Sequence, residues 1–275
     1  MSKLKCELYH DNFQNYKSYG IPKAQLVIAD IPYNLADKAY ASNPMWYNGG
    51  DNSNGESKLA KKSFFNSDGN FKLAEYMHFC STLLKKEPKG NSEAPAMIVF
   101  CAFDQDAYLI ELAKRYGFDH HYRIFFFKNY SAQVLKANMK IVGATEHALV
   151  FYRDKLPKFR NGCERDENGK AIRGTGKMVF DWFEWRRDSS SEYPKIHPTQ
   201  KPVGTLKQII QIFTDPGDVV IDPCAGSAST LRAAYETGRN SYGFEVDKNF
   251  YTLAKEKMLA PLFVKPEFEQ IELHG

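Results

Sequence analysis

The chain has 275 residues, of which 43% are hydrophobic and 25% charged, with a formal net charge of +4. These values are typical of a globular protein with one large α/β domain or two small ones, and they permit a polyanionic partner without requiring one. No apolar run reaches the about 18 residues of a membrane span, and the first residues carry no apolar signal region, so we expect a cytoplasmic protein without a membrane partner. Five scattered cysteines without a C-x-x-C pair favour reduced thiols over a disulfide or zinc framework, and we expect no metal.

Two short strands are predicted near the start of the chain. Residues 4–9 alternate apolar and polar side chains and end at His10-Asp11-Asn12, while residues 25–29 suit a strand buried on both faces of a parallel sheet. The second strand is followed directly by Asp30-Ile31-Pro32-Tyr33, at the sheet edge where open α/β proteins bind ligands. The acid can accept a hydrogen bond from an amino group, and the aromatic ring can stack on a flat base. Taken alone, the stretch also fits a simple Asp–Pro turn followed by a core tyrosine.

The middle of the chain alternates predicted helices and strands. Residues 36–70 are rich in Asn, Gly and Ser, and we predict a mobile flap over a substrate because loops of this length in compact domains are usually functional. Strands that alternate with helices indicate a parallel sheet with crossover connections. The elements predicted here are a helix at 71–86, a strand at 96–103, a second helix after Asp104, and strands at 122–127 and 147–152. We expect Asp104 to cap the second helix and Gly117 to end it. Its inward-facing residues are predicted to be Tyr108, Leu109, Leu112, Ala113 and Tyr116.

A basic segment follows the last of these strands. Residues 153–177 hold eight Lys or Arg against four acids, and an aromatic cluster within 180–185 leads to Arg186-Arg187. Basic residues beside aromatic rings suit contacts with phosphates and bases, although a charge run is as often a solvated face. The predicted nucleic-acid contacts are Arg160, Arg173, Arg186 and Arg187.

The last third of the chain has the pattern of a nucleotide site. His197–Pro202 precedes a predicted helix over 203–213, and a strand at 219–221 runs into the small residues of 222–230, where the backbone can approach a ligand at the start of the next helix. A further strand ends at Glu245, where an acid in a nucleotide-binding α/β unit typically holds ribose hydroxyls. The chain contains neither G-x-x-x-x-G-K-S/T nor a full G-x-G-x-x-G, which argues against ATP and NAD.

Four of these stretches together resemble the amino-group DNA methyltransferases that use S-adenosylmethionine. Residues 30–33 resemble the family's Asp-Pro-Pro-Tyr catalytic motif, residues 222–227 its Asp-Pro-Phe-Ala-Gly-Ser cofactor loop, and residues 197–202 its His-Pro-Thr-Gln-Lys-Pro stretch, while Glu245 matches its ribose-binding acid. The catalytic motif comes first, an order that resembles the circularly permuted beta group. Two departures are Ile31 in place of the first proline and Ala228 in place of a frequent glycine.

The resemblance implies a single α/β, Rossmann-like methyltransferase domain over residues 1–275, with a mostly parallel seven-stranded sheet flanked by helices. In this arrangement residues 24–152 form the catalytic half, 153–195 a small basic target-recognition segment, and 196–260 the cofactor-binding half. The residues implied are Asp30, Pro32 and Tyr33 for catalysis, and Asp11, His197, Thr199, Lys201, Asp222, Cys224, Ala225, Gly226, Ser227 and Glu245 for S-adenosylmethionine.

The implied reaction is methyl transfer to the exocyclic amine of a flipped base in double-stranded DNA. Adenine N6 is favoured over cytosine N4, because an aspartate at the first motif position is more usual in the adenine enzymes. An RNA or protein-amide methyltransferase is disfavoured by the motif order, and a DNA-binding relative without catalysis by the intact motifs. A homodimer, and a restriction enzyme as partner in restriction-modification, are left open.

Overall fold

The computed structural model describes residues 3–33, 71–90, 92–128, 133–136, 141–164, 166–168, 170–197 and 199–263. The flap predicted at 36–70 and Pro198 of the His-Pro-Thr-Gln-Lys-Pro stretch lie outside the described residues.

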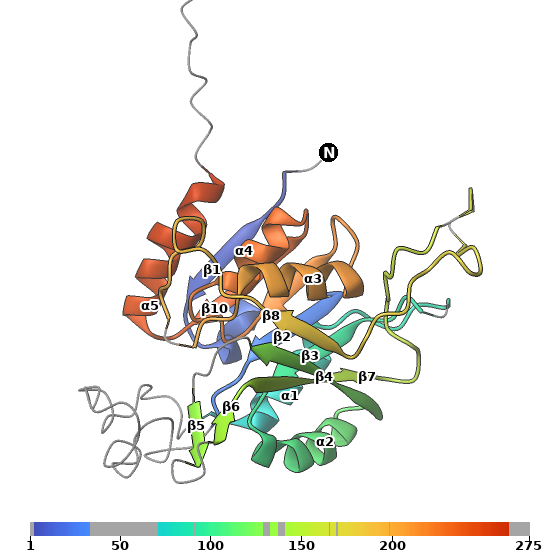
Figure 1. The fold of residues 1–275 in the computed structure, drawn as a ribbon. Helices are drawn as coiled ribbons and strands as arrows, with labels where there is room; N and C mark the ends of the chain where they lie inside the picture. Colours follow the sequence, from blue (N-terminus) through green and yellow to red (C-terminus); the bar gives the residue numbers. More distant parts are fainter. Residues whose placement is uncertain are drawn as a thin grey trace, which may run out of the picture.

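An eight-stranded sheet in the order β1-β10-β9-β2-β3-β7-β4-β8 forms the centre of the fold (Figure 1). Its strands are β1 (Cys6–His10), β2 (Leu26–Asp30), β3 (Ala96–Phe100), β4 (His120–Lys128), β7 (Thr145–Tyr152), β8 (Trp182–Trp185), β9 (Val219–Asp222) and β10 (Asn240–Glu245). Neighbouring strands are parallel except where β7 pairs with β3 and β4. The predicted α/β class is therefore confirmed. The count of seven strands is wrong, because the aromatic cluster of the basic segment forms β8 and extends the sheet beside β4.

Helices cover both faces of the sheet, which explains the continuous apolar runs of the central strands (Figure 1). On β2, Leu26 and Ile28 pack on one side, while Val27 and Ala29 pack on the other. The first side holds α3 (Val203–Phe213), α4 (Ser229–Glu236) and the helical turn of Ala254–Leu259 that continues α5 (Lys248–Leu253). The second side holds α1 (Leu73–Leu83), α2 (Asp106–Arg115) and the 3-10 turn η1 (Phe13–Ser18). The remaining short elements are the hairpin of β5 (Gln133–Lys136) and β6 (Ile141–Gly143), and the 3-10 turns η4 (Phe103–Gln105) and η7 (Ala260–Leu262).

The start of α2 differs from the prediction. The chain first makes the η4 turn, so α2 begins at Asp106 and the predicted cap at Asp104 is wrong. Leu109 is buried as predicted, whereas Tyr108 is 58% exposed, because adjacent helical positions point about 100° apart and only one of the two can face the sheet. Gly117 follows the helix with a φ of +81°, the left-handed conformation typical of a glycine at a helix end.

The sheet topology brings the polar ends of several strands to one edge. Because β2 pairs directly with β9, Asp30 and Asp222 end neighbouring parallel strands, as the sequence predicted. The antiparallel β7 begins at this same edge, so its early residues Glu146 and His147 lie beside the last residues of β3 and β4. Residues from both halves of the chain thus meet at the carboxyl edge of the sheet.

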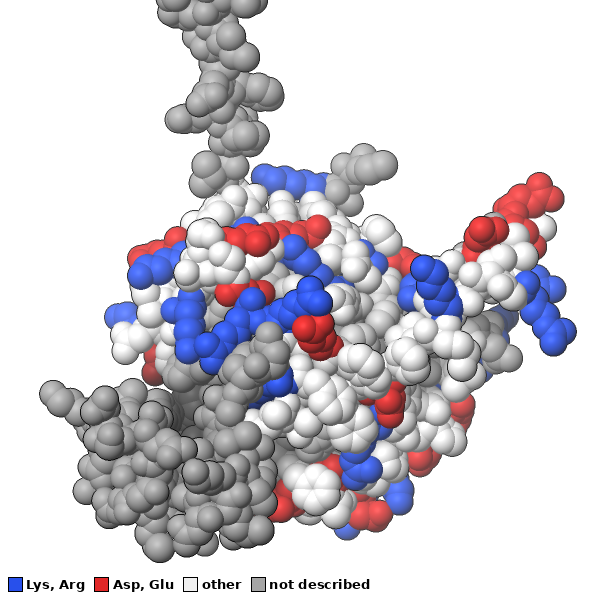
Figure 2. Space-filling view, in the orientation of Figure 1, with Lys and Arg blue, Asp and Glu red and all other residues white. Residues whose placement is uncertain are grey.

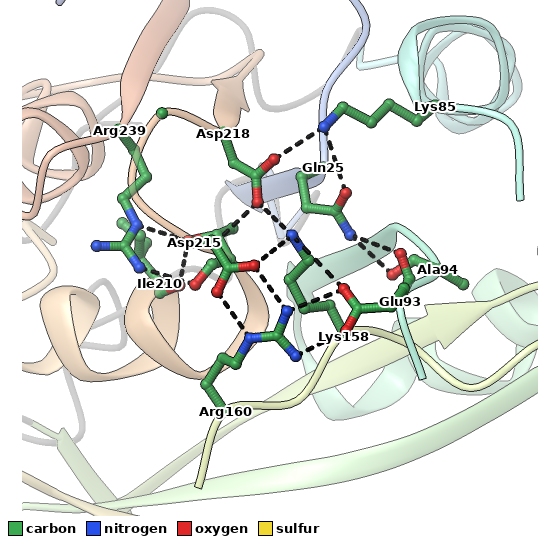
Figure 3. A network of polar contacts seen from close by, with 12 residues as sticks. Gln25, Lys85, Glu93, Ala94, Lys158, Arg160, Ile210, Asp215, Asp218 and Arg239 are labelled. Carbon is green, nitrogen blue, oxygen red and sulfur yellow. Dashed lines mark hydrogen bonds and ion pairs between the residues drawn. The ribbon is translucent and has the colours of Figure 1, made fainter. Parts of the chain in front are cut away.

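The opposite edge is closed by a network of ion pairs (Figure 3). Lys158 Nζ lies 2.7 Å from Asp218 Oδ2 and 2.8 Å from Asp215 Oδ2. The guanidinium of Arg160 donates two hydrogen bonds to Asp215, at 2.6 and 2.7 Å, and two to Glu93, at 2.9 and 3.0 Å. These contacts fasten the segment after β7 to the loop between α3 and β9. Arg160, predicted as a nucleic-acid contact, therefore lies in a structural network at the edge away from Asp30.

Candidate active site

Asp30, which is half-buried, forms an ion pair with a buried lysine from the other half of the chain. Lys201 Nζ donates to Asp30 Oδ2 at 2.7 Å and lies 3.1 Å from Glu146 Oε2. The second carboxylate, Glu146, also pairs with Lys128 at the end of β4. Two acids and two lysines thus alternate at this edge of the sheet, where β2 and β4 end and β7 begins.

Burial and charge act in opposite directions on these groups. Burial raises the pKa of Asp30 above its usual value, and the charge of Lys201 opposes that rise. Burial alone would lower the pKa of Lys201, but the two carboxylates beside it raise it well above its usual value. Burial also acts to raise the pKa of Glu146, yet the charges of Lys201 and Lys128 hold it below its usual value. Lys201 is therefore a protonated cation between two acids.

The two oxygens of the Asp30 carboxylate differ in their surroundings. Oδ2 accepts the hydrogen bond from Lys201, whereas Oδ1 is buried and has no hydrogen-bond partner within the described part of the chain. Glu146 Oε2 is likewise buried without a hydrogen-bond partner among the described residues. A buried acceptor without a partner costs free energy, and a donating ligand is one way to satisfy it.

The turn after Asp30 is held by a residue from the next strand-to-helix connection. Gln105 Nε2 donates to the Pro32 carbonyl at 3.0 Å, and Gln105 Oε1 accepts from the backbone N–H of Ala102, also at 3.0 Å. The Ile31 side chain is buried, and its N–H donates to the Phe100 carbonyl at 3.2 Å. Tyr33 is half-buried at the end of this turn, with its ring 6.0 Å from Lys201 Nζ. The turn is thus fixed by hydrogen bonds on both sides of Pro32.

The predicted cofactor loop connects β9 to α4. Asp222 is buried and accepts from the backbone N–H of Cys224 at 2.9 Å, and Ala225 N–H donates to the Phe244 carbonyl at 2.8 Å. Burial raises the pKa of Asp222 to about 7. Gly226 has a φ of +51° and Ala228 a φ of +60°, so two positions of this loop are left-handed. The left-handed backbone at Ala228 explains why glycine is frequent at this position in the family that the sequence resembles. Ser227 is also buried.

Glu245 ties the end of β10 to this loop. Its Oε2 accepts from the Gly226 N–H at 2.8 Å, and its Oε1 from the Asp247 N–H at 2.7 Å. Burial raises the pKa of Glu245 to about 7. Each carboxylate oxygen keeps a second lone pair, so Glu245 can still accept hydrogen bonds from two ribose hydroxyls.

His197 lies over the cofactor loop, close to Gly226. A side chain added at Gly226 would meet the His197 ring at 3.7 Å, and the ring packs against Phe250 with centroids 4.4 Å apart. Its Nδ1 lies 3.0 Å from the exposed Thr199 hydroxyl. Burial and the charge of Lys201 lower the pKa of His197 to about 4, so the imidazole is neutral near pH 7.

Asp11 lies at the end of β1 and caps its own turn. Its Oδ2 accepts from the Tyr19 hydroxyl at 2.6 Å, and its Oδ1 accepts from Asn12 and Asn15, both at 2.7 Å. The predicted contact with the adenine of the cofactor remains a prediction, and this geometry gives Asp11 a local structural role of its own.

Three of the four predicted arginines lie on the surface. Arg186 and Arg187 directly follow β8 and are exposed, and Arg186 pairs with Glu184 at 2.7 Å. Arg173 is exposed within the basic segment. Lys and Arg side chains gather between α5 and β8 on the face shown in Figure 2. The surface near the end of β8 therefore offers positive charge, while Arg160 is committed to the ion pairs of Figure 3.

The residues brought together here include two that the sequence analysis does not single out. Glu146 directly precedes the strand predicted at 147–152, and Gln105 lies in the helix predicted after Asp104. Neither belongs to a motif, and the position of Glu146 depends on β7 running antiparallel, which periodicity does not report. The only available signal is a charged residue at the start of an otherwise apolar strand.

One cluster of the described residues has metal-ligand chemistry. Cys101, Asp106 and His147 place their ligand atoms within 4.8 Å of one another. His147 Nε2 is already 2.8 Å from Asp106 Oδ1, and Arg123 donates to Asp106 Oδ2 at 2.9 Å. The cluster is therefore a hydrogen-bonded group in which the polar atoms satisfy one another.

The chain matches the sequence profile of the N6/N4 DNA methylase family over residues 24–256. The chain belongs to this family. It is 26% identical to the DNA adenine methyltransferase YhdJ of Escherichia coli K12 across 94% of this chain and 83% of that protein. It is also 30% identical to the type II methyltransferase M.MjaI of Methanocaldococcus jannaschii, over 45% of this chain and 42% of the relative. These matches confirm the family resemblance drawn from the motifs.

Several solved structures have the same fold as this chain. M1.HpyAVI superposes with a TM-score of 0.60 at 21% identity, covering 92% of this chain and 98% of the other. The cytosine-N4-specific PvuII DNA methyltransferase gives 0.61 at 15% identity, covering 93% and 86%. One related structure is a complex of M1.HpyAVI with S-adenosylmethionine, the cofactor of this family. Among the described residues there is no helix with the length and apolar character to cross a bilayer.

Proposed function

We propose that this protein transfers a methyl group from S-adenosylmethionine to the exocyclic amine of a base in double-stranded DNA, with adenine N6 as the preferred target. The observation that carries the proposal is the position of Asp30. Its unpartnered Oδ1 lies at the end of β2, beside the strand that leads into the loop of residues 222–228. An acceptor for an amine thus neighbours a loop suited to a nucleoside-bearing methyl donor.

The residues of the loop fit S-adenosylmethionine in their chemistry. Glu245 has acceptor capacity for ribose hydroxyls, and the left-handed backbone at Gly226 opens the loop without a side chain. Asp222 and Glu245 both have a pKa raised to about 7 by burial, and a sulfonium cation nearby would compensate their ionised forms. When bound, S-adenosylmethionine supplies an electrophilic methyl group.

The role proposed for Asp30 is to make the amine of the base a better nucleophile. An amine conjugated to a purine or pyrimidine ring is a poor nucleophile, because its lone pair is delocalised into the ring. Asp30 Oδ1 would accept one N–H, and we assign the second to the Ile31 carbonyl, because the Pro32 carbonyl already accepts from Gln105. Two acceptors favour a tetrahedral nitrogen whose lone pair points at the methyl group. The N–C bond would form as the S–C bond breaks, the sulfur would keep the electron pair of that bond, and the nitrogen would release one proton to solvent.

The remaining contribution is positioning. A base inside a duplex must flip out, at a cost of a few kcal/mol, and stacking on the Tyr33 ring would offset roughly 1–3 kcal/mol of it. We propose that residues 153–195 recognise the target, with Arg173, Arg186 and Arg187 near phosphates. We favour adenine over cytosine because Asp30 occupies the first motif position and a relative that covers 94% of this chain is a DNA adenine methyltransferase.

The direct test supplies the purified protein with methyl-labelled S-adenosylmethionine and, separately, double-stranded DNA, RNA and a protein mixture. We expect label in DNA, recovered as N6-methyldeoxyadenosine after digestion to nucleosides. Recovery as N4-methyldeoxycytidine would support methyl transfer to DNA but would identify cytosine N4, and not adenine N6, as the target. Label in RNA or protein with none in DNA would overturn the proposal. The Asp30→Asn variant is the matched control for a contaminating methyltransferase.

A further inference from the structure

We propose that Lys201 is a positioning residue that orients Asp30 for methyl transfer, and that it acts through the ion pair with Asp30 and Glu146 and makes no contact with the methyl donor. This inference rests on the proposed function, because it assigns Lys201 a role only if Asp30 accepts the amine.

The surroundings of the Lys201 ammonium group support this assignment. Lys201 is only 7% exposed; its Nζ donates a hydrogen bond to Asp30 Oδ2 and forms an ion pair with Glu146 Oε2 at 3.1 Å. The rings of Phe100 and Trp185 lie 5.1 and 5.4 Å from Nζ. The ammonium is thus enclosed by carboxylates and aromatic rings, and its charge is already balanced within the protein.

The ion pair makes the two oxygens of Asp30 unequal. Lys201 holds Oδ2, and this leaves Oδ1 as the acceptor for an incoming amine. A carboxylate fixed at one oxygen cannot exchange the roles of its two oxygens by rotation, so the amine meets an acceptor at a defined place. Small displacements of such an acceptor are costly in rate, because transfer needs nitrogen, methyl carbon and sulfur in line.

The same pair controls how strongly Asp30 accepts, since a protonated carboxyl has one O–H donor and is a weaker, uncharged acceptor. The groups that act on Asp30 come from each packed element: Lys201 before α3, Glu146 on β7, Tyr33 on the adjoining turn, and Asp222 at the end of β9. Lys128 on β4 acts indirectly, by pairing with Glu146. Lys201 favours the ionised form of Asp30, and Glu146 disfavours it.

Two substitutions should therefore shift the pH dependence in opposite directions. Lys201→Met leaves Asp30 beside Glu146 without their shared cation, so the acid limb of single-turnover methylation should move up by roughly 1 unit or more. Because Asp30 also loses the contact that orients it, the plateau rate above that limb should fall by at least about tenfold. Glu146→Gln removes the repelling charge, so that limb should move down. Lys201→Arg, which keeps the cation, should recover part of the rate. The affinity for S-adenosylmethionine should stay within about twofold in all three variants.

The matched control is Lys207→Met. Lys207 lies in α3 and is also an ion-paired lysine, but its partners are Glu236 on α4 and Tyr193. This variant should keep the wild-type pH profile. If Lys201→Met fails to fold, Glu146→Gln and Lys201→Arg still decide the question, since only the proposed coupling predicts a downward shift in the former and partial rescue in the latter.

The Asp30→Asn background separates this inference from the proposed function. If Lys201 acts through Asp30, adding Lys201→Met to Asp30→Asn should cause no further loss of rate. A further loss in the double variant, a large fall in S-adenosylmethionine affinity, or acid limbs that do not move would overturn the role of Lys201. Normal turnover by Asp30→Asn alone would instead overturn the catalytic assignment on which the inference depends.

Discussion

The backbone N–H of Gly226 donates to Glu245 Oε2 at 2.8 Å, and this contact joins the loop after β9 to the end of β10. The acid assigned to the ribose therefore also fixes the loop that would surround the cofactor. Replacing Glu245 should affect both tasks, and the two effects can be measured separately.

Glu245→Ala should weaken S-adenosylmethionine binding by roughly 1.5–3 kcal/mol, or about 10- to 100-fold, because ribose hydroxyls lose a charged acceptor. Calorimetry measures the affinity, and thermal unfolding without ligand reports how much the loop contact contributes to stability. Val246→Ala, at an exposed neighbouring position, is the matched control. An unchanged affinity in Glu245→Ala would remove the ribose assignment.

The affinity for S-adenosylmethionine should rise with pH between about 6 and 8. The pKa values of Asp222 and Glu245 are raised to about 7, and the ionised forms suit a cationic, hydroxyl-bearing ligand. A group that must ionise with a pKa near 7 changes the affinity about tenfold across this range. Glu245→Gln should reduce this dependence of affinity on pH. If the affinity of that variant still rises steeply with pH, the dependence comes from Asp222 alone.

Without ligand, the same two acids should make folding stability fall as pH rises from about 4 to about 7. The folded state binds their protons more tightly than the unfolded chain, where carboxyl pKa values lie near 4, so unfolding releases protons in this window. Urea unfolding at several pH values tests this, and Glu245→Gln should reduce the slope. An equal slope in that variant would show that Glu245 does not titrate in the window.

Much of this fold follows from the sequence, because continuous apolar runs, helical spacing and the motif order each report local or family-level constraints. The strand ends at Asp30, Asp222 and Glu245 agree with the prediction for that reason. Less can be predicted where pairing between distant strands decides the outcome. The antiparallel direction of β7 brings Glu146 to Lys201, and the aromatic run that suggests base stacking instead forms β8, with Phe183 and Trp185 in the core. Charge alone also cannot separate Arg160, bound by two acids, from the exposed arginines.

DNA affinity should depend on salt through the exposed arginines. Replacing Arg173, Arg186 and Arg187 together by Ala should reduce the steepness of log affinity against log salt by up to about 0.9 for each DNA phosphate that the variant no longer neutralises. Fluorescence anisotropy with a labelled duplex at several salt concentrations gives the slope. A slope equal to that of the wild type would make this surface a solvated face.

Arg160→Ala provides the contrasting variant in the same segment. It leaves Asp215 and Glu93 without their shared guanidinium, so the free energy of unfolding should fall by about 1–3 kcal/mol, while the salt slope of DNA binding stays unchanged. Arg160 and Lys158 hold the pKa of Asp215 well below its usual value, which adds stability above about pH 4 that is lost as pH falls further. A reduced salt slope with unchanged stability would return Arg160 to the DNA-contacting set.

The central claim is tested most directly by single-turnover methylation of duplex DNA by Asp30→Asn. Asparagine keeps the size of the side chain but loses the charge and presents a donor beside the amine. We expect the rate to fall by about 10²-fold or more, in line with loss of a charged transition-state contact. The affinity for S-adenosylmethionine should barely change, because the proposal places Oδ1 toward the base, and thermal unfolding will report any cost of the altered Lys201 pair. Methylation at the wild-type rate by a folded Asp30→Asn protein would contradict the account.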